Sequence, residues 1–121
     1  MPTVLAILAE GFEEIEAITP IDLLRRAGVK VTLATLSDGK HVTGRSGLTM
    51  HAETSIAAIP AHVYDCVFLP GGPGVKHLRA SQQVLEILHT QNAAGRMMEC
   101  PDWRNEFNRT PGRMGCIGRS I

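Results

Sequence analysis

Two short segments hold the residues whose types could do chemistry, and the first is a run of glutamates. Glu10, Glu13, Glu14 and Glu16 follow an apolar segment at the start of the chain. Acidic residues in a first helical turn favour its positive end and stay solvated, as we expect of Glu10, Glu13 and Glu14. Glu16 lies between two apolar residues, so it could be partly buried at the strand ends. A protonated carboxyl there could donate a hydrogen bond to a thiolate.

The second segment is a loop of proline and glycine that follows another apolar run. It reads Pro70-Gly71-Gly72-Pro73-Gly74. Glycine amides in such a loop can approach an anion closely or form an oxyanion hole, because no Cβ stands in the way. A plain turn between a strand and a helix explains the same composition. The segment lacks the Gly-Lys-Ser/Thr of a phosphate-binding loop and the spacing of a dinucleotide fingerprint.

The three cysteines, Cys66, Cys100 and Cys116, show no pattern of known chemistry. Cys66 lies inside a predicted strand, where we expect a small core residue. Cys100 precedes Pro101, and neither Cys100 nor Cys116 is followed by a helix pattern that would activate a thiol. The five histidines form no His-x-x-x-His pair and the cysteines form no Cys-x-x-Cys pair. We therefore expect no metal site and no cofactor.

The first third of the chain reads as a strand, a helix and a second strand. Thr3–Leu8 is an apolar run without polar alternation, which is typical of a strand covered on both faces. Glu13–Ala27 has helical spacing and is followed by Gly28, a residue that often ends helices. Pro20 lies within this span, so we expect either a kink or a second helix that begins at Pro20. Val29–Leu36 is rich in β-branched residues and predicts the second strand.

Residues 42–90 are predicted to form further strands and helices, with the glycine loop between a strand and a helix. We expect a β-excursion over Val42–Ala52, a helical turn over Ser55–Ile59, a buried strand over Cys66–Leu69 and a helix over Ser81–Thr90. This order predicts an open parallel sheet with helices on both faces. Right-handed crossovers would bring the loops at 9–11 and 70–74 to the same edge of that sheet, where such folds bind ligands.

Size and charge exclude several classes of protein. The chain has 121 residues, enough for one small domain, and its 12 basic residues balance its 12 acidic residues. A neutral chain is an unusual nucleic-acid binder. No apolar run approaches the roughly 18 residues of a membrane span, and residues 1–8 lack the features of a signal peptide. We expect a cytoplasmic protein without nucleic-acid or membrane partners.

The composition changes abruptly at Met97. Residues 1–96 contain 12 Ala, 11 Leu and 8 Val, whereas residues 97–121 contain none of these. About eight would be expected at the upstream frequency. Residues 97–121 are interpreted as a frame-shifted or misjoined segment, a divergent natural tail, or a binding appendage. The first of these explains best why no apolar periodicity survives.

Three blocks of the sequence resemble the ThiJ/PfpI superfamily, in its parkinsonism-associated protein deglycase branch. They are Leu8–Ala17, Pro20–Val31 and Tyr64–Gly72. The resemblance extends over residues 3–96, about four fifths of the chain. It implies a flavodoxin-like doubly wound α/β fold, here truncated on its C-terminal side. Residues 1–96 would be a partial domain of this type, and residues 97–121 a divergent or frame-shifted tail.

The resemblance also implies an activity and a set of site residues. Members include cysteine-dependent deglycases and glyoxalases that act on methylglyoxal-type adducts and protect against oxidative stress, and most form homodimers. Glu16 matches the glutamate that contacts the nucleophile, and Gly72, next to Gly71, matches the glycine of the oxyanion hole. Counting from Gly95-Arg96, the nucleophile position falls on Asp102, and the nearest thiol is Cys100. No nucleophile is therefore matched.

Three hypotheses follow for the function. The first is a member of this family with little or no turnover. The second is an enzyme that uses Cys100 or Cys116 as a substitute nucleophile on a small carbonyl or glycated substrate. The third is a non-catalytic chaperone or interaction module. Loss of the central strand after residue 96 would uncover the helices at 13–27 and 81–90, so we also expect marginal stability or self-association.

Overall fold

The computed structural model describes residues 2–37, 39–59 and 63–99. A five-stranded parallel sheet forms its centre, in the order β5-β2-β1-β6-β7. The predicted mostly parallel fold is thus confirmed. The strands of the sheet are β1 (Thr3–Leu8), β2 (Lys30–Thr35), β5 (Thr54–Ser55), β6 (Cys66–Phe68) and β7 (Met97–Glu99).

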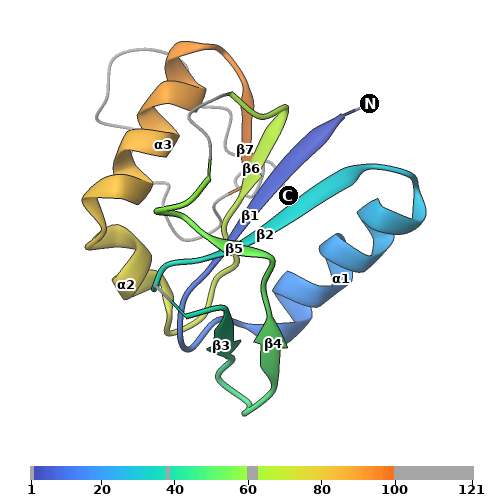
Figure 1. Cartoon of the computed structure of the whole chain (residues 1–121), viewed down its shortest axis with the longest axis vertical. Helices are drawn as coiled ribbons and strands as arrows, with labels where there is room; N and C mark the ends of the chain where they lie inside the picture. The colour runs from blue at the N-terminus through green and yellow to red at the C-terminus, as the bar shows by residue number, and fades with distance from the viewer. Residues whose placement is uncertain (1, 38, 60–62, 100–121) are drawn as a thin grey trace.

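Helices cover both faces of this sheet, as the doubly wound fold requires (Figure 1). Helix α1 (Glu14–Arg26) lies on one face, while α2 (Val75–Arg79) and α3 (Gln82–Ala93) lie on the other. The side chains of β1 alternate between two cores. Leu5 and Ile7 join the core under α2 and α3, whereas Val4, Ala6 and Leu8 join the core under α1. Every residue from Val4 to Leu8 is buried, which explains the unbroken apolar run.

Helix α1 begins and ends where its capping residues indicate. The Glu13 side chain accepts a hydrogen bond from the Ile15 amide at 3.2 Å, which satisfies one of the free amides of the first turn. Gly28 follows the last turn with φ +88°, a conformation that glycine adopts without strain. Pro20 lies within this one continuous helix, so the alternative of a second helix starting there is wrong.

A small antiparallel hairpin leaves the sheet after β2 and lies near the end of β1. It consists of β3 (His41–Thr43) and β4 (Thr49–His51), as the β-excursion predicted from the sequence requires. Figure 1 shows it beyond the sheet, at the end where the β1 arrow points. The helical turn predicted at 55–59 is wrong at its start, because Thr54 and Ser55 pair with Ala34 and Thr35 of β2 as strand β5.

The expectation that the chain loses its strand after residue 96 needs correction. Strand β7 places residues 97–99, the first of the expected tail, parallel to β6. Met98 is fully buried and packs in the same core as Val84 and Leu88 of α3, which are fully buried too. The apolar face of α3 is therefore covered. Cys100, Asp102, Cys116 and the rest of residues 100–121 lie outside the described residues.

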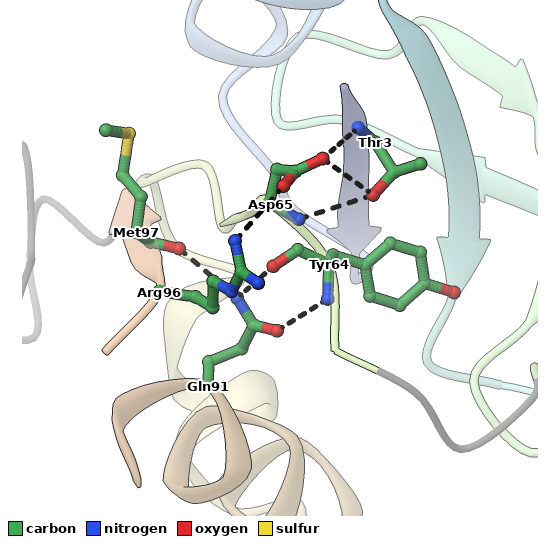
Figure 2. A network of polar contacts seen from close by, with 6 residues as sticks. All are labelled: Thr3, Tyr64, Asp65, Gln91, Arg96 and Met97. Atoms are coloured by element: carbon green, nitrogen blue, oxygen red, sulfur yellow. Dashed lines mark hydrogen bonds and ion pairs between the residues drawn. The ribbon is translucent and has the colours of Figure 1, made fainter. Parts of the chain in front are cut away.

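A buried amide ties α3 to the two strands that it covers (Figure 2). Gln91 is 1% exposed. Its Oε1 accepts from the Tyr64 amide at 2.8 Å, and its Nε2 donates to the carbonyls of Tyr64 at 3.0 Å and Met97 at 3.4 Å. A polar side chain can be buried at low cost only when it is bonded in this way. Gln91 thereby fixes α3 against the segments that lead into β6 and β7.

Asp65 joins three strands at their amino ends in the same network (Figure 2). Its Oδ2 accepts from the Thr3 amide at 2.7 Å and from the Thr3 hydroxyl at 3.3 Å. Its Oδ1 forms an ion pair with Arg96 at 3.4 Å. The hydrogen bond from the Thr3 amide is the main reason why the pKa of Asp65 lies below its ordinary value. The candidate site lies at the other end of the strands, where their carboxyl ends meet.

Candidate functional site

The two loops singled out in the sequence meet at the carboxyl edge of the sheet. The Gly71 amide donates a hydrogen bond of 2.9 Å to Oε1 of Glu16. The Gly71 carbonyl accepts one of 3.0 Å from the Glu13 amide. Glu16 comes from the first turn of α1 and Gly71 from the loop after β6, 55 residues further along. The first turn of one helix and the glycine loop are thus bonded to each other directly.

Gly72 presents its amide beside this contact. Its φ is +98°, and a Cβ at this position would lie 2.9 Å from the Glu13 amide nitrogen and 3.2 Å from the Gly11 carbonyl oxygen. Both the backbone angle and the space therefore require glycine. Within the described ranges the Gly72 amide has no hydrogen-bond acceptor. An amide held in place and left without a partner can bind a negatively charged oxygen.

The β1–α1 loop is held from two sides. The Gly74 amide donates to the Gly11 carbonyl at 3.0 Å, and the Gly11 amide donates to the Thr43 carbonyl at 2.9 Å. Oε2 of Glu10 accepts from the Thr43 amide at 3.0 Å. A Cβ at Gly74 would lie 2.7 Å from the Glu10 carbonyl oxygen, so only glycine allows the two loops to pack this closely. The site geometry rests on these backbone contacts.

Glu16 is more exposed than its sequence neighbours suggest. The sequence left partial burial possible, but the residue is exposed in the structure, although its hydrogen bond with the Gly71 amide is part-buried. Only Oε1 is hydrogen bonded, which leaves Oε2 without a partner among the described residues. The flanking apolar residues do not indicate burial at this position, because Ile15 itself is 74% exposed.

Glu14 is the acidic residue that is buried, and sequence reasoning missed it. It is 4% exposed, although we expected a solvated residue. Its Oε2 accepts from the amides of Ser46 at 2.8 Å and Leu48 at 3.2 Å, both in the turn of the hairpin. Burial alone would raise the pKa of Glu14, but the hydrogen bonds from backbone amides outweigh it and hold that pKa below its ordinary value. Glu14 therefore anchors the hairpin to α1.

Replacing Glu14 with glutamine should remove an acid-dependent part of the stability. A carboxyl with a lowered folded-state pKa stabilises the fold fully above its unfolded value of 4.5 and loses this contribution as the pH falls through the folded value. We expect Glu14→Gln to be less stable than the wild type in urea at pH 7. The difference should shrink at pH 3. An equal loss of stability at pH 7 and pH 3 would contradict the lowered pKa of Glu14. Glu86→Gln, on the exposed side of α3, is the control.

The other acidic residues of the cluster also have structural partners. Besides capping α1, Glu13 forms an ion pair with Arg45 at 3.7 Å. Glu10 is exposed and bonded to the hairpin. The cluster therefore works mainly as an anchor for the hairpin, and Glu16 is the member aimed at the glycine loop.

A pocket of about 320 Å³ opens at the same edge, between the ends of β1 and β2. Leu8, Leu36 and Val42 form its apolar walls, and Glu10 and His77 add polar groups. Neither Glu16 nor the Gly71-Gly72 pair lines it. The predicted site residues thus lie at a neighbouring position, between the loops that follow β1 and β6.

No thiol is placed at this position by the described residues. Cys66, the cysteine among them, is half-buried within β6 and packs against the core under α1, as expected for a small core residue. Among residues 2–37, 39–59 and 63–99, no group of three or more His, Cys, Asp or Glu side chains is arranged to hold a metal ion. None of the helices found there is long and apolar enough to cross a membrane.

Known proteins with similar sequences indicate one protein family. The sequence model of the DJ-1/PfpI family matches residues 2–99. The protein dj-1beta of Drosophila melanogaster is 40% identical over 92 residues, which are 75% of this chain and 49% of that protein. A deglycase from Thermococcus kodakarensis is 30% identical over 84 residues, which are 69% of this chain and 50% of that protein. The chain spans about half the length of these relatives.

Solved structures give the same result. Toxoplasma gondii DJ-1 in its oxidized form superposes with a TM-score of 0.79 and 37% sequence identity, over 82% of this chain and 54% of that chain. Drosophila melanogaster DJ-1beta superposes with a TM-score of 0.78 and 37% identity, over 81% and 53% of the two chains. The likeness therefore extends from the sequence to the arrangement of the whole described sheet.

Proposed function

Because the chain belongs to the DJ-1/PfpI family, we propose that it keeps the glutamate and glycine half of a deglycase-type site but has no cysteine-dependent turnover of its own. The observation that supports this most is the hydrogen bond of 2.9 Å from the Gly71 amide to Glu16, beside the Gly72 amide, which has no acceptor among the described residues. Related proteins named as deglycases make a carbonyl or glycated adduct the expected ligand class.

The two halves of such a site have separate tasks. An amide such as that of Gly72 stabilises the negative oxygen that develops when a carbonyl is attacked. A carboxyl such as that of Glu16 contacts the attacking group and orients it. The attack itself requires a nucleophile, and in this family a thiolate supplies it. Counting along the sequence places Asp102 at that position, with Cys100 two residues earlier and followed by Pro101.

The glutamate and glycine half-site should bind a ligand without turning it over. A half-site of this kind can hold the oxygen of a small carbonyl or carboxylate through the Gly72 amide. It cannot form the covalent intermediate, because a carboxylate at position 102 is a much weaker nucleophile than a thiolate. A cytoplasmic location is part of the proposal, since an odd and sparse set of three cysteines suits a reducing compartment better than a disulfide framework does.

Methylglyoxal consumption by the purified chain tests the proposal. We expect no loss of methylglyoxal above a buffer control, and the same result with Cys100→Ser and Cys116→Ser. A protein-dependent rate that either substitution abolishes would overturn the proposal and favour the substitute-nucleophile hypothesis. A rate that survives both substitutions would overturn it too. Circular dichroism of each variant shows that it is folded.

Self-association is the second part of the proposal, and exposed apolar side chains support it. Ile15 is 74% exposed on the outer face of α1, and Leu48 is 56% exposed in the hairpin turn. The Leu48 amide donates a hydrogen bond to Glu14, the neighbour of Ile15, so the hairpin turn lies beside the first turn of α1. Two copies that pair through this region would cover apolar area on both. We therefore propose a homodimer.

Replacing both residues with aspartate should separate the dimer. Sedimentation velocity of the wild type should show a species of twice the chain mass at micromolar concentration. Ile15→Asp with Leu48→Asp should give the single chain mass, because two buried carboxylates would face each other across the pair. Leu23→Asp, at a 59% exposed position nearer the other end of α1, is the control and should remain dimeric. A wild type that sediments as a monomer would contradict the dimer.

A further inference from the structure

The hairpin carries a pair of histidines that no part of the proposed site uses. His41 of β3 and His51 of β4 are directly opposite each other. The Ala52 amide donates to the Lys40 carbonyl, and the Gly44 amide donates to the Leu48 carbonyl. Hydrogen-bonded pairs alternate with non-hydrogen-bonded pairs along an antiparallel ladder. Because the pairs 40–52 and 44–48 are hydrogen bonded, His41 and His51 form a non-hydrogen-bonded pair. Side chains of such pairs approach each other most closely.

The two rings meet through one nitrogen each. Nδ1 of His51 lies 3.3 Å from Nε2 of His41. The ring centroids are 4.9 Å apart and the ring planes are inclined by 65°. Both side chains are exposed, so a hydrogen bond between them adds little to stability. The contact between the two rings thus contributes little to the stability of the hairpin. A role in binding a ligand would explain it better.

The separation of the two nitrogens fits a shared metal ion. Imidazole nitrogens bind zinc at about 2.0–2.1 Å, so two ligands of a tetrahedral ion lie about 3.3–3.4 Å apart. The hairpin already holds His41 and His51 at 3.3 Å. A small rotation of the exposed rings would turn both lone pairs toward a common point. The backbone therefore supplies most of the ordering that chelation requires.

We propose that His41 and His51 form a two-histidine site for a divalent first-row transition metal such as Ni²⁺, Cu²⁺ or Zn²⁺. Neutral imidazole is a preferred ligand of these ions. Nδ1 of His51 and Nε2 of His41 bind the metal, and each ring carries its proton on its other nitrogen. No group of three such ligands occurs within the described ranges, so water completes the coordination.

The site lies next to contacts that hold the β1–α1 loop. Thr43, two residues from His41 on β3, accepts a hydrogen bond from the Gly11 amide and donates one to Glu10. On the same face of the hairpin, the hydroxyls of Thr43 and Thr49 are 2.8 Å apart. A metal that bridges β3 and β4 would therefore stiffen the hairpin that supports this loop.

Calorimetric titration of the whole chain with Ni²⁺ tests the site. Removing one of two ligands should cost no less than the tenfold to hundredfold that loss of a supporting residue costs. We therefore expect His41→Gln and His51→Gln each to weaken Ni²⁺ binding by at least about tenfold. His77→Gln, which removes an exposed histidine on α2, is the matched control and should bind as the wild type does. The cysteines are the same in all four proteins, so any binding to thiols cancels.

Nuclear magnetic resonance locates the bound ion. In the wild type, Zn²⁺ should shift the ¹⁵N signals of Nδ1 of His51 and Nε2 of His41 more than those of the other ring nitrogens. Equal Ni²⁺ affinity of the wild type and both hairpin variants would overturn the proposal. Zn²⁺ shifts confined to other histidines would overturn it as well. Urea midpoints of the variants should match that of the wild type, because exposed side chains are replaced.

Discussion

Phe12→Ala is expected to destabilise the fold by about 3–5 kcal/mol, the usual cost of truncating a buried phenylalanine. Phe12 is 1% exposed and fills the core under α1, together with Val4, Leu8 and Ile21. It lies in the β1–α1 loop between the glutamates of the candidate site. The lost side chain therefore leaves a cavity directly beneath the residues that the site needs. Domains of this size have only about 5–15 kcal/mol of net stability.

Urea unfolding followed by circular dichroism measures this loss. The midpoint for Phe12→Ala should fall far below that of the wild type. Leu23→Ala is the matched control, because Leu23 is apolar but 59% exposed. Its effect should stay within about 0.5 kcal/mol. Similar midpoints for the two variants would contradict the packing described for Phe12.

Gly72→Ala is expected to cost about 2–4 kcal/mol, from backbone strain and from collision together. The φ of +98° is unfavourable for alanine, and the added Cβ would lie 2.9 Å from the Glu13 amide nitrogen. The atoms that it would meet are the Glu13 amide nitrogen, the Glu13 Cβ and the Gly11 carbonyl oxygen, and none of these is the far end of a flexible side chain. The Gly72 amide should also turn away from the position where it can bind an oxygen.

Gly28→Ala separates the two causes. Gly28 has a φ of +88°, but a Cβ there would meet nothing within 4 Å. Its substitution should therefore cost only the strain, about 1 kcal/mol. Chemical denaturation of both variants gives the difference. If Gly28→Ala is as destabilising as Gly72→Ala, the collision at the glycine loop does not exist.

The sequence predicted the parts of the fold that local pattern and burial determine together. The bounds of β1 match the apolar run, because every one of its residues from Val4 onward is buried. Helix α1 is one residue shorter at each end than expected, and Gly28 follows its end as the pattern indicated, whereas the capping role of Glu13 was not predicted. The three-residue strand β7 carries no such pattern. Its structure comes from pairing with β6, about 30 residues away, and from the burial of Met98.

The candidate site was predicted in part. The resemblance indicated Glu16 and Gly72, and the structure brings Glu16 to the neighbouring Gly71 amide. The role of Glu14 could not be predicted, because its partners lie 32 and 34 residues further along the chain. The histidine pair was missed for a similar reason. The spacing rules applied to the sequence test neighbouring turns of a helix, whereas His41 and His51 meet across a hairpin.

The position of β1 at the centre of the sheet has a consequence for how the chain acquires its structure. One neighbour of β1 is β2, which begins at Lys30, but the other is β6, which begins only at Cys66 and itself pairs with β7 from Met97. During synthesis from the amino end, β1 therefore leaves the ribosome long before its second partner exists. Such long-range pairing slows folding and exposes apolar strands meanwhile. The nascent chain should depend on a molecular chaperone until about residue 99 has emerged.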